Sequence, residues 1–196
     1  MLAGKWIRRR VFSSLLGLHR RKTMRVACIG SRGLSNQELD LCRQMGRLLV
    51  RAGYELHSGN APGADQAFAA GGNEVDPSLV FLHLPWPGFE KQAALQGNQV
   101  DTYPFEDMRF YVDIAAENHP YWNRLKSGVR KLHTRNAAIL VPGKRNVDVC
   151  LAWPSRKPGG GGTGQGMRIA QKRGIRLLDL TRVNPQQVIR WLEDIQ

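Results

Sequence analysis

Glycine-rich turns that directly follow short apolar segments are the feature of this chain that most limits its fold. The longest is the run 158–163, Pro-Gly-Gly-Gly-Gly-Thr, which lies between a strand-like segment at 147–153 and a helical pattern followed by a second strand-like segment at 175–180. Glycine lets a backbone approach a ligand closely, and the first turn of a helix offers free N–H groups to an anion. The run therefore predicts a phosphate-binding turn at the edge of a parallel sheet.

Two similar turns occur earlier in the chain. The first is 30–33, Gly-Ser-Arg-Gly, and the second is 58–65, Ser-Gly-Asn-Ala-Pro-Gly-Ala-Asp. A single glycine turn is a weak signal, because glycines also form ordinary tight turns. Ligands of parallel α/β sheets bind outside the carboxyl ends of the strands, near a switch in strand order. Three such turns after three strands are therefore expected to meet at one site.

The rest of the pattern alternates strands with helices. The expected strands are 26–30, 54–58, 79–84, 147–153 and 175–180. The expected helices are one that starts at a capping box of Ser35 and Glu38, then 63–70, 105–116, 121–136 and 163–173, and a last one after Asn184-Pro185. Residues 85–104 are expected to form an irregular loop. This order predicts a Rossmann-like three-layer α/β sandwich with a mainly parallel sheet of about five strands.

The candidate ligand contacts are the residues of the three turns and the tryptophan that ends the fourth expected strand. They are Gly30, Ser31, Arg32, Ser58, Gly59, Gly63, Ala64, Asp65, Trp153, Gly160, Gly161, Gly162 and Thr163. Arg32 supplies a guanidinium for a phosphate and Thr163 a hydroxyl donor. Two positions keep two interpretations each: Asp65 accepts from a ribose hydroxyl or compensates a helix terminus, and Trp153 stacks on a base or packs at the sheet edge.

The charge of this chain is unevenly distributed. The 196 residues carry a net +13, of which residues 1–23 contribute seven Lys/Arg and no acid, leaving +6 for residues 24–196. We expect 24–196 to form one domain and 1–23 a disordered or loosely helical extension. Three alternatives stay open for this segment. It is a basic arm, it is a targeting peptide, or translation begins after it, at Met24. Basic residues on the expected helix 121–136 are candidates for nucleic-acid contact: Arg124, Lys126, Arg130, Lys131 and Arg135.

Several classes of protein are disfavoured by the sequence. No apolar run is long enough to cross a bilayer, and Cys28, Cys42 and Cys150 lack metal-ligand spacing, which favours a reducing, cytoplasmic location and no metal site. The chain lacks both G-x-x-x-x-G-K-[ST] and G-x-G-x-x-G, so a P-loop NTPase or a dehydrogenase is not expected, and no cofactor is required. His57 lies at the end of the second expected strand, beside the glycine turn, where it either faces a ligand or is structural.

The turns together resemble the SLOG superfamily of Rossmann-like proteins, which includes the DNA-processing protein DprA and the LOG-type phosphoribohydrolases. The matching motifs are G-S-R at 30–32, S-G-N-A-P-G-A-D at 58–65 and G-G-G-T at 160–163. Residues 119–122 and 132–136 are similar to segments of small DprA-like proteins of bacteriophages. The resemblance implies a Rossmann-like fold that binds a nucleotide or single-stranded DNA, and it allows for a homo-oligomer.

One departure from the LOG pattern concerns catalysis. The LOG enzymes carry P-G-G-x-G-T-x-x-E, and here Gly166 stands in place of the glutamate that takes part in cleavage. Glycine cannot transfer a proton, so the resemblance implies binding without LOG-type hydrolysis. Two alternatives stay open: a hydrolase of nucleoside monophosphates or other ribosyl ligands that uses another acid, with Glu106, Asp107 and Glu117 unplaced, and a phage-encoded protein that sequesters a nucleotide signal.

Overall fold

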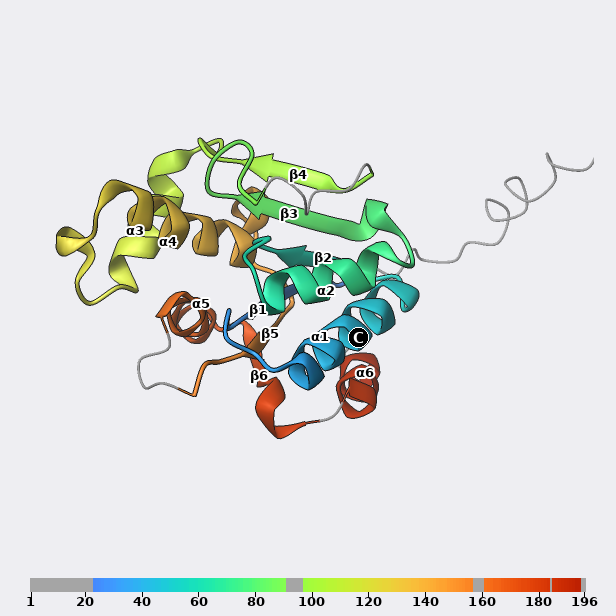
Figure 1. Ribbon diagram of the computed structural model, residues 1–196. Coiled ribbons are helices and arrows are strands. Elements are labelled where there is room, and N and C mark those ends of the chain that lie inside the picture. Colours follow the sequence, from blue (N-terminus) through green and yellow to red (C-terminus); the bar gives the residue numbers. More distant parts are fainter. Residues whose placement is uncertain (1–22, 91–96, 157–160, 184, 195–196) are drawn as a thin grey trace, which may run out of the picture.

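A six-stranded parallel sheet forms the centre of the protein in a computed structural model that describes residues 23–90, 97–156, 161–183 and 185–194 (Figure 1). The strands are β1 (Arg25–Gly30), β2 (Glu55–Ser58), β3 (Val80–Leu84), β4 (Gln99–Thr102), β5 (Val149–Trp153) and β6 (Arg176–Asp179). Their order across the sheet is β4-β3-β2-β1-β5-β6, and every neighbouring pair is parallel. In β1 the four interior residues are all buried, as expected of a strand covered on both faces.

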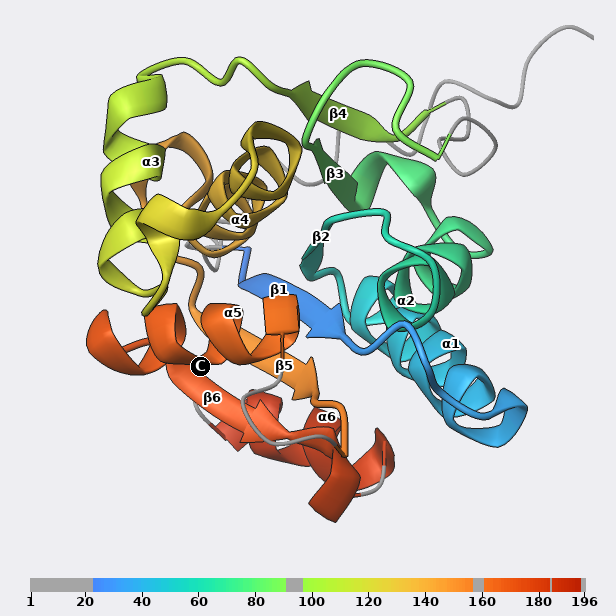
Figure 2. The ribbon, with the colours of Figure 1, turned by 60° about the vertical axis from the view of Figure 1, so that its left-hand side comes forward.

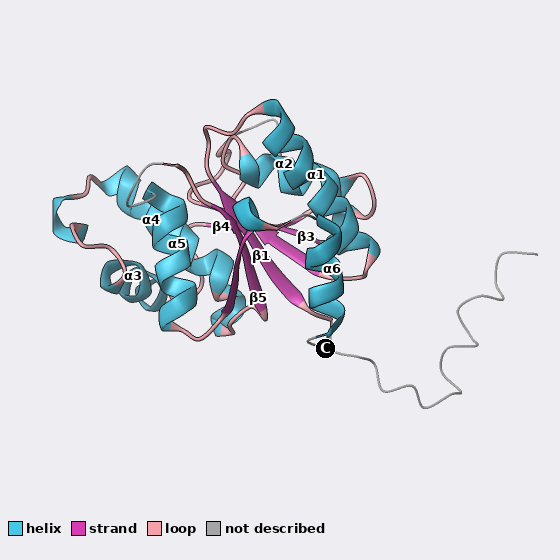
Figure 3. Ribbon diagram, turned by 90° about the horizontal axis from the view of Figure 1, so that it is seen from below, coloured by secondary structure: helices cyan, strands magenta, loops and turns pink. Residues whose placement is uncertain are grey.

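Helices cover both faces of the sheet (Figure 3). One layer consists of α1 (Asn36–Arg51), α2 (Ala64–Asn73) and α6 (Pro185–Asp194), and the other of α3 (Met108–Glu117), α4 (Ser127–Leu140) and α5 (Gly161–Lys172). Alternate residues of β1 serve the two layers: Val26 and Cys28 join the core with α1 and α2, while Ala27 and Ile29 join the core with α3, α4 and α5. The expected three-layer α/β sandwich is confirmed.

The first helix shows how local sequence fixes an element. The Oγ atom of Ser35 accepts from the backbone N–H of Glu38, and the Glu38 carboxylate accepts from the backbone N–H of Ser35 at 2.7 Å. This is the expected capping box, and Gly53 with φ +81° follows the last turn of the helix. The first glycine turn, which lies between β1 and this cap, is therefore held at both ends.

Two sequence-based assignments were wrong. Residues 99–102 form the edge strand β4 rather than part of a loop, and they carry no apolar alternation because they lie exposed at the edge of the sheet. The basic helix α4 begins at Ser127 and not at residue 121. A short 3₁₀ helix η3 (Trp122–Arg124) precedes it, and Leu125 and Lys126 are extended, so the chain changes direction there.

The strand order creates one switch point. The chain steps outward from β1 to β4 and then returns to place β5 on the other side of β1 (Figure 2). The N–H of Ser31 donates to the carbonyl of Trp153 at 2.9 Å, so the two strands stay together up to their carboxyl ends. A crevice outside these ends is the usual ligand position of an open α/β sheet. No helix among the described residues has the length and apolar character needed to cross a membrane.

Candidate functional site

A cavity of about 510 Å³ lies at the switch point, outside the carboxyl ends of β1 and β5. All three glycine turns and one face of α4 contribute to its wall. The lining residues are Gly30, Ser31, Arg32, Ala61, Asp65, Val129, Leu132, His133, Arg135, Asn136, Ser155, Gly161, Gly162 and Thr163. The structure thus brings the three turns together, although the first and third are more than 100 residues apart in the sequence.

The first and second turns are fastened to each other by backbone contacts. Gly63 has φ +94°, and a Cβ atom there would lie 2.6 Å from the carbonyl oxygen of Ser31, so only glycine fits. The N–H of Ala64 donates to the same carbonyl at 3.1 Å. The Asp65 carboxylate accepts from the N–H of Gly30 at 3.2 Å and from the N–H of Ala61 at 3.4 Å. Asp65 therefore holds the two turns in register and also forms part of the cavity wall.

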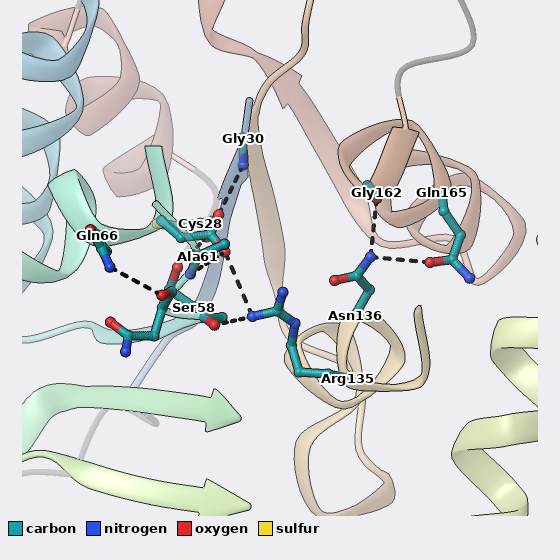
Figure 4. A network of polar contacts seen from close by, with 12 residues as sticks. Cys28, Gly30, Ser58, Ala61, Gln66, Arg135, Asn136, Gly162 and Gln165 are labelled. Atoms are coloured by element: carbon teal, nitrogen blue, oxygen red, sulfur yellow. Dashed lines mark hydrogen bonds and ion pairs between the residues drawn. The ribbon is translucent and has the colours of Figure 1, made fainter. Parts of the chain in front are cut away.

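A buried ion pair stands behind the second turn (Figure 4). Arg135 is 4% exposed, its Nη1 atom donates to the carbonyl of Gly59, and the same atom lies 3.9 Å from Oδ2 of Asp65. Burial raises the pKa of the Asp65 carboxyl and lowers the pKa of Arg135, while each charge opposes the shift of the other. Arg135 thus belongs to the interior and the cavity wall, not to the exposed basic surface on which its spacing in the sequence had placed it.

The third turn is tied to α4 by amide side chains. The Nδ2 atom of Asn136 donates to the carbonyl of Gly162 at 3.2 Å and to Oε1 of Gln165 at 3.1 Å (Figure 4). The other end of the Gln165 side chain, Nε2, donates to the carbonyl of Ala115 at 3.0 Å. Gln165 is fully buried, so this contact joins α3, α4 and α5 behind the turn.

His133 is oriented by the same glutamine. Its Nδ1 atom lies 2.7 Å from Oε1 of Gln165, and this oxygen is an acceptor because Nε2 of Gln165 donates to Ala115. The neutral imidazole therefore carries its hydrogen on Nδ1 and a lone pair on Nε2. Burial lowers the pKa of His133, which keeps the ring neutral at pH 7. Sequence reasoning missed the roles of His133, Asn136 and Gln165, although 132–136 belongs to a motif, because partners 29 to 32 residues apart leave no local pattern.

Other expected contacts lie behind the cavity rather than in its wall. Ser58 Oγ donates to the carbonyl of Cys28 at 2.8 Å, and Gly59 presents its carbonyl to Arg135. Trp153 is 7% exposed and packs with the core on the side of α1 and α6, because its place in β5 directs it to that face. The packing interpretation of Trp153 is the one its position supports. Gly160 lies outside the described residues.

The remaining basic candidates lie around the start of α4. Arg124 and Lys126 are exposed, while Arg130 and Lys131 lie against aromatic rings. The Arg130 guanidinium is 5.6 Å from the centre of the Trp122 ring, and the Lys131 ammonium is 5.0 Å from that of Tyr103. The same helix lines the cavity with Val129 and Leu132, so the basic surface and the cavity adjoin.

The acids considered for catalysis do not reach the cavity. Glu117 pairs with Lys172 at 3.0 Å, Asp107 pairs with Lys144, and Glu106 is exposed. Gly166, at the position of the LOG glutamate, packs against β1 and is not part of the cavity lining. A Cβ atom there would be 2.6 Å from Cδ1 of Ile29. Within the described ranges, no cluster of histidine, cysteine and acidic side chains suited to a metal ion was found.

The sheet order, the two helical layers and the cavity at the switch point define a Rossmann-like α/β fold. No family model and no curated protein matches the chain. Among solved structures, a DNA processing protein A from Helicobacter pylori, described for its single-stranded DNA binding mode, is similar with a TM-score of 0.58 and 17% identity, over 87% of this chain and 80% of that one. A structural-genomics target, TM1055, has a TM-score of 0.48 and 21% identity, over 79% and 72%. The chain thus shares the Rossmann-like α/β fold of the Helicobacter pylori protein.

Proposed function

We propose that this protein binds the phosphates of a nucleotide or of single-stranded DNA in the cavity at the switch point. The observation that carries the proposal is the convergence of three glycine turns on one cavity, with Arg32 and Thr163 in its wall. Backbone N–H groups at such turns and a guanidinium are the groups that proteins use for phosphate. The buried Arg135 holds the second turn in place through the carbonyl of Gly59 and offsets the charge of Asp65 in the cavity wall.

The surroundings of the cavity favour an anionic ligand. Residues 118–147, which contain α4, include seven Lys/Arg and no acid. Asp65 is the one carboxylate among the described residues that line the cavity, and its oxygens are engaged by backbone N–H groups and face Arg135. A chain with a net charge of +13 also attracts polyanions at a distance.

Single-stranded DNA is the candidate that the similar structure supports. The Helicobacter pylori protein, whose fold this chain shares, has a single-stranded DNA binding mode. The basic residues at the start of α4 adjoin the cavity, as a strand longer than one nucleotide would need. Positively charged grooves that follow the backbone are typical of proteins that bind single strands.

The test compares two arginines. Arg32→Ala should weaken binding of a labelled single-stranded oligothymidylate by about 1.5–3 kcal/mol, because it removes a charge-assisted hydrogen bond to phosphate. Arg109→Ala is the matched control, since Arg109 lies on α3 with a side chain 93% exposed and does not line the cavity. Equal affinities of the two variants, both folded by circular dichroism, would refute the proposal.

A further inference from the structure

A second hollow lies next to the cavity, in the turn between α3 and α4. It measures about 540 Å³ and is lined mainly by residues 119–124. His119 belongs to its wall, and the ring of His119 contacts the ring of His133, with centroids 4.4 Å apart. His133 belongs to the wall of the first cavity. A pair of touching imidazole rings, one from each wall, therefore connects the two hollows.

The wall of this second hollow exposes an aromatic ring. Tyr121 is 59% exposed. The other large apolar side chains that are exposed among the described residues are all valines. The N–H of Tyr121 donates to Nδ1 of His119 at 3.2 Å, which fixes the turn that presents the ring. The Arg124 guanidinium lies 5.7 Å from the centre of the Tyr121 ring. The guanidinium thus lies over a ring that is largely exposed to solvent, and aromatic rings and arginine side chains are both groups on which nucleobases stack.

The charge around the hollow selects the kind of occupant. Arg124 lines the hollow and is exposed, and Lys126, two residues later in the chain, is exposed as well. The nearest acid that precedes the hollow in the chain, Glu117, is paired with Lys172. An apolar peptide could pack on the aromatic ring and an acidic peptide could pair with the cations. A nucleic-acid strand can do both, because each nucleotide carries a flat base and a phosphate.

We propose that the hollow around Tyr121 is a second subsite, which stacks a base of the nucleotide next to the one whose phosphate occupies the cavity. Arg124 and Lys126 then contact the phosphate that follows. This inference rests on the proposed function and narrows it: the ligand is a single strand of at least two nucleotides, which passes over the His119–His133 pair from one hollow to the next.

The experiment separates base stacking from phosphate binding. Two single strands of equal length are compared, oligothymidylate and the same backbone with abasic sites throughout. Tyr121→Ala should weaken oligothymidylate binding roughly 5- to 100-fold and leave abasic-strand binding unchanged, because it removes stacking alone. Tyr121→Trp should keep or strengthen binding of oligothymidylate. Val75→Ala removes another exposed apolar side chain, just after α2, and should change neither affinity.

The Arg32→Ala variant distinguishes failure of this inference from failure of the proposed function. If Arg32→Ala weakens binding of both strands while Tyr121→Ala changes neither, the second subsite is wrong and the cavity still binds phosphate. If Tyr121→Ala weakens both strands equally, Tyr121 does not act by stacking and the inference is again overturned. If neither variant changes any affinity, both proposals fail.

Discussion

Arg135 and Asp65 place two opposite charges inside the protein, directly behind the second glycine turn. Their side chains are 4% and 7% exposed. Each has further partners, since Arg135 donates to Gly59 and Asp65 accepts from Gly30 and Ala61. A buried pair of this kind contributes little net stability, but removal of one partner leaves the other charge buried and uncompensated. The same two residues therefore line the candidate site and carry buried charges that affect the stability of the fold.

A double-mutant cycle tests this dependence. Asp65→Asn and Arg135→Met should each lower the free energy of unfolding by about 3 kcal/mol, because each leaves a buried charge alone. The double variant should lose at least about 1 kcal/mol less than the sum of the two single losses. Urea denaturation of the four proteins measures these values. Losses that add to within about 0.5 kcal/mol would show that the two charges do not interact.

A chain of polar side chains across β2, β3 and β4 makes stability depend on pH. His57 Nδ1 lies 3.1 Å from His83 Nε2, His83 Nδ1 lies 3.3 Å from Asp101, and His57 Nε2 lies 3.5 Å from Glu55. Burial lowers the pKa of His57 to about 4, an effect that Glu55 opposes and that His83 and Arg25 reinforce. Burial also lowers the pKa of His83, with Asp101 opposing and Arg135 and Arg25 reinforcing the shift.

The stability that His57 contributes is expected to fall in acid. In the unfolded chain a histidine has a pKa near 6.5, so between about pH 6.5 and 4 the unfolded state binds a proton that the native state does not. The contribution is complete above about pH 6.5 and should decline by about 2–3 kcal/mol as the pH falls to about 4.5. Urea midpoints from pH 7 to 4.5 should fall more steeply for the wild type than for His57→Gln. Parallel curves would contradict the assignment to His57.

At the scale of elements, the start of α5 is where the third turn meets the cavity. Gly161 has φ +51° and nothing within 4 Å of an added Cβ atom, and it lines the cavity. Gly174, after α5, has φ +65° and equally open surroundings, but it is not part of the cavity wall. The two positions therefore share a left-handed backbone conformation and differ in their relation to the site.

This pair allows a matched substitution. Gly161→Leu should abolish binding of oligothymidylate, because the side chain fills the space where the backbone meets the ligand, while Gly174→Leu should not affect binding. Both should lower the free energy of unfolding by a similar amount, of the order of 1 kcal/mol, because both force a side chain into a left-handed conformation. Calorimetric titration and thermal melting together measure the two effects. Retained affinity in a folded Gly161→Leu protein would remove the third turn from the site.

Elements differ in how far the sequence reveals them. The turns after β1, β2 and β5 could be predicted because buried parallel strands have apolar sequences and glycines follow them here. The edge strand β4 could not, since exposed Gln99–Thr102 has the composition of a loop. The burial of Arg135 could not be predicted either. Its partner Gly59 is 76 residues away, and a helical face rich in cations is usually exposed to solvent. Exposure at the sheet edge therefore concealed β4, and contacts between distant segments determined the position of Arg135.

At the scale of the whole molecule, the basic extension remains a prediction. Residues 1–22 lie outside the described residues, and β1 begins at Arg25. A protein that starts at Met24 should fold with an unchanged melting temperature, because it keeps all six strands and every described residue of the two core clusters. If the extension binds DNA, its removal should flatten the log–log salt dependence of single-strand binding by about 0.7 for each phosphate that the extension neutralises.

Two results would change this interpretation. A protein that starts at Met24 and does not fold would place the extension inside the domain. An unchanged salt slope would assign residues 1–23 to targeting, to a later start of translation or to another partner. Binding isotherms at several salt concentrations, together with a melting curve, separate these outcomes.

The pairing of β1 with β5 determines when, during synthesis, the cavity can form. The N–H of Arg25 donates to Asp148, 123 residues later, and the cavity needs turns from both ends of that interval. During synthesis the segment that contains β1 to β4 is made before β5 and α5. Distant pairings of this kind also form slowly. The cavity can therefore form only after residue 163 has been made, so shorter nascent or truncated chains are expected not to bind the proposed ligand.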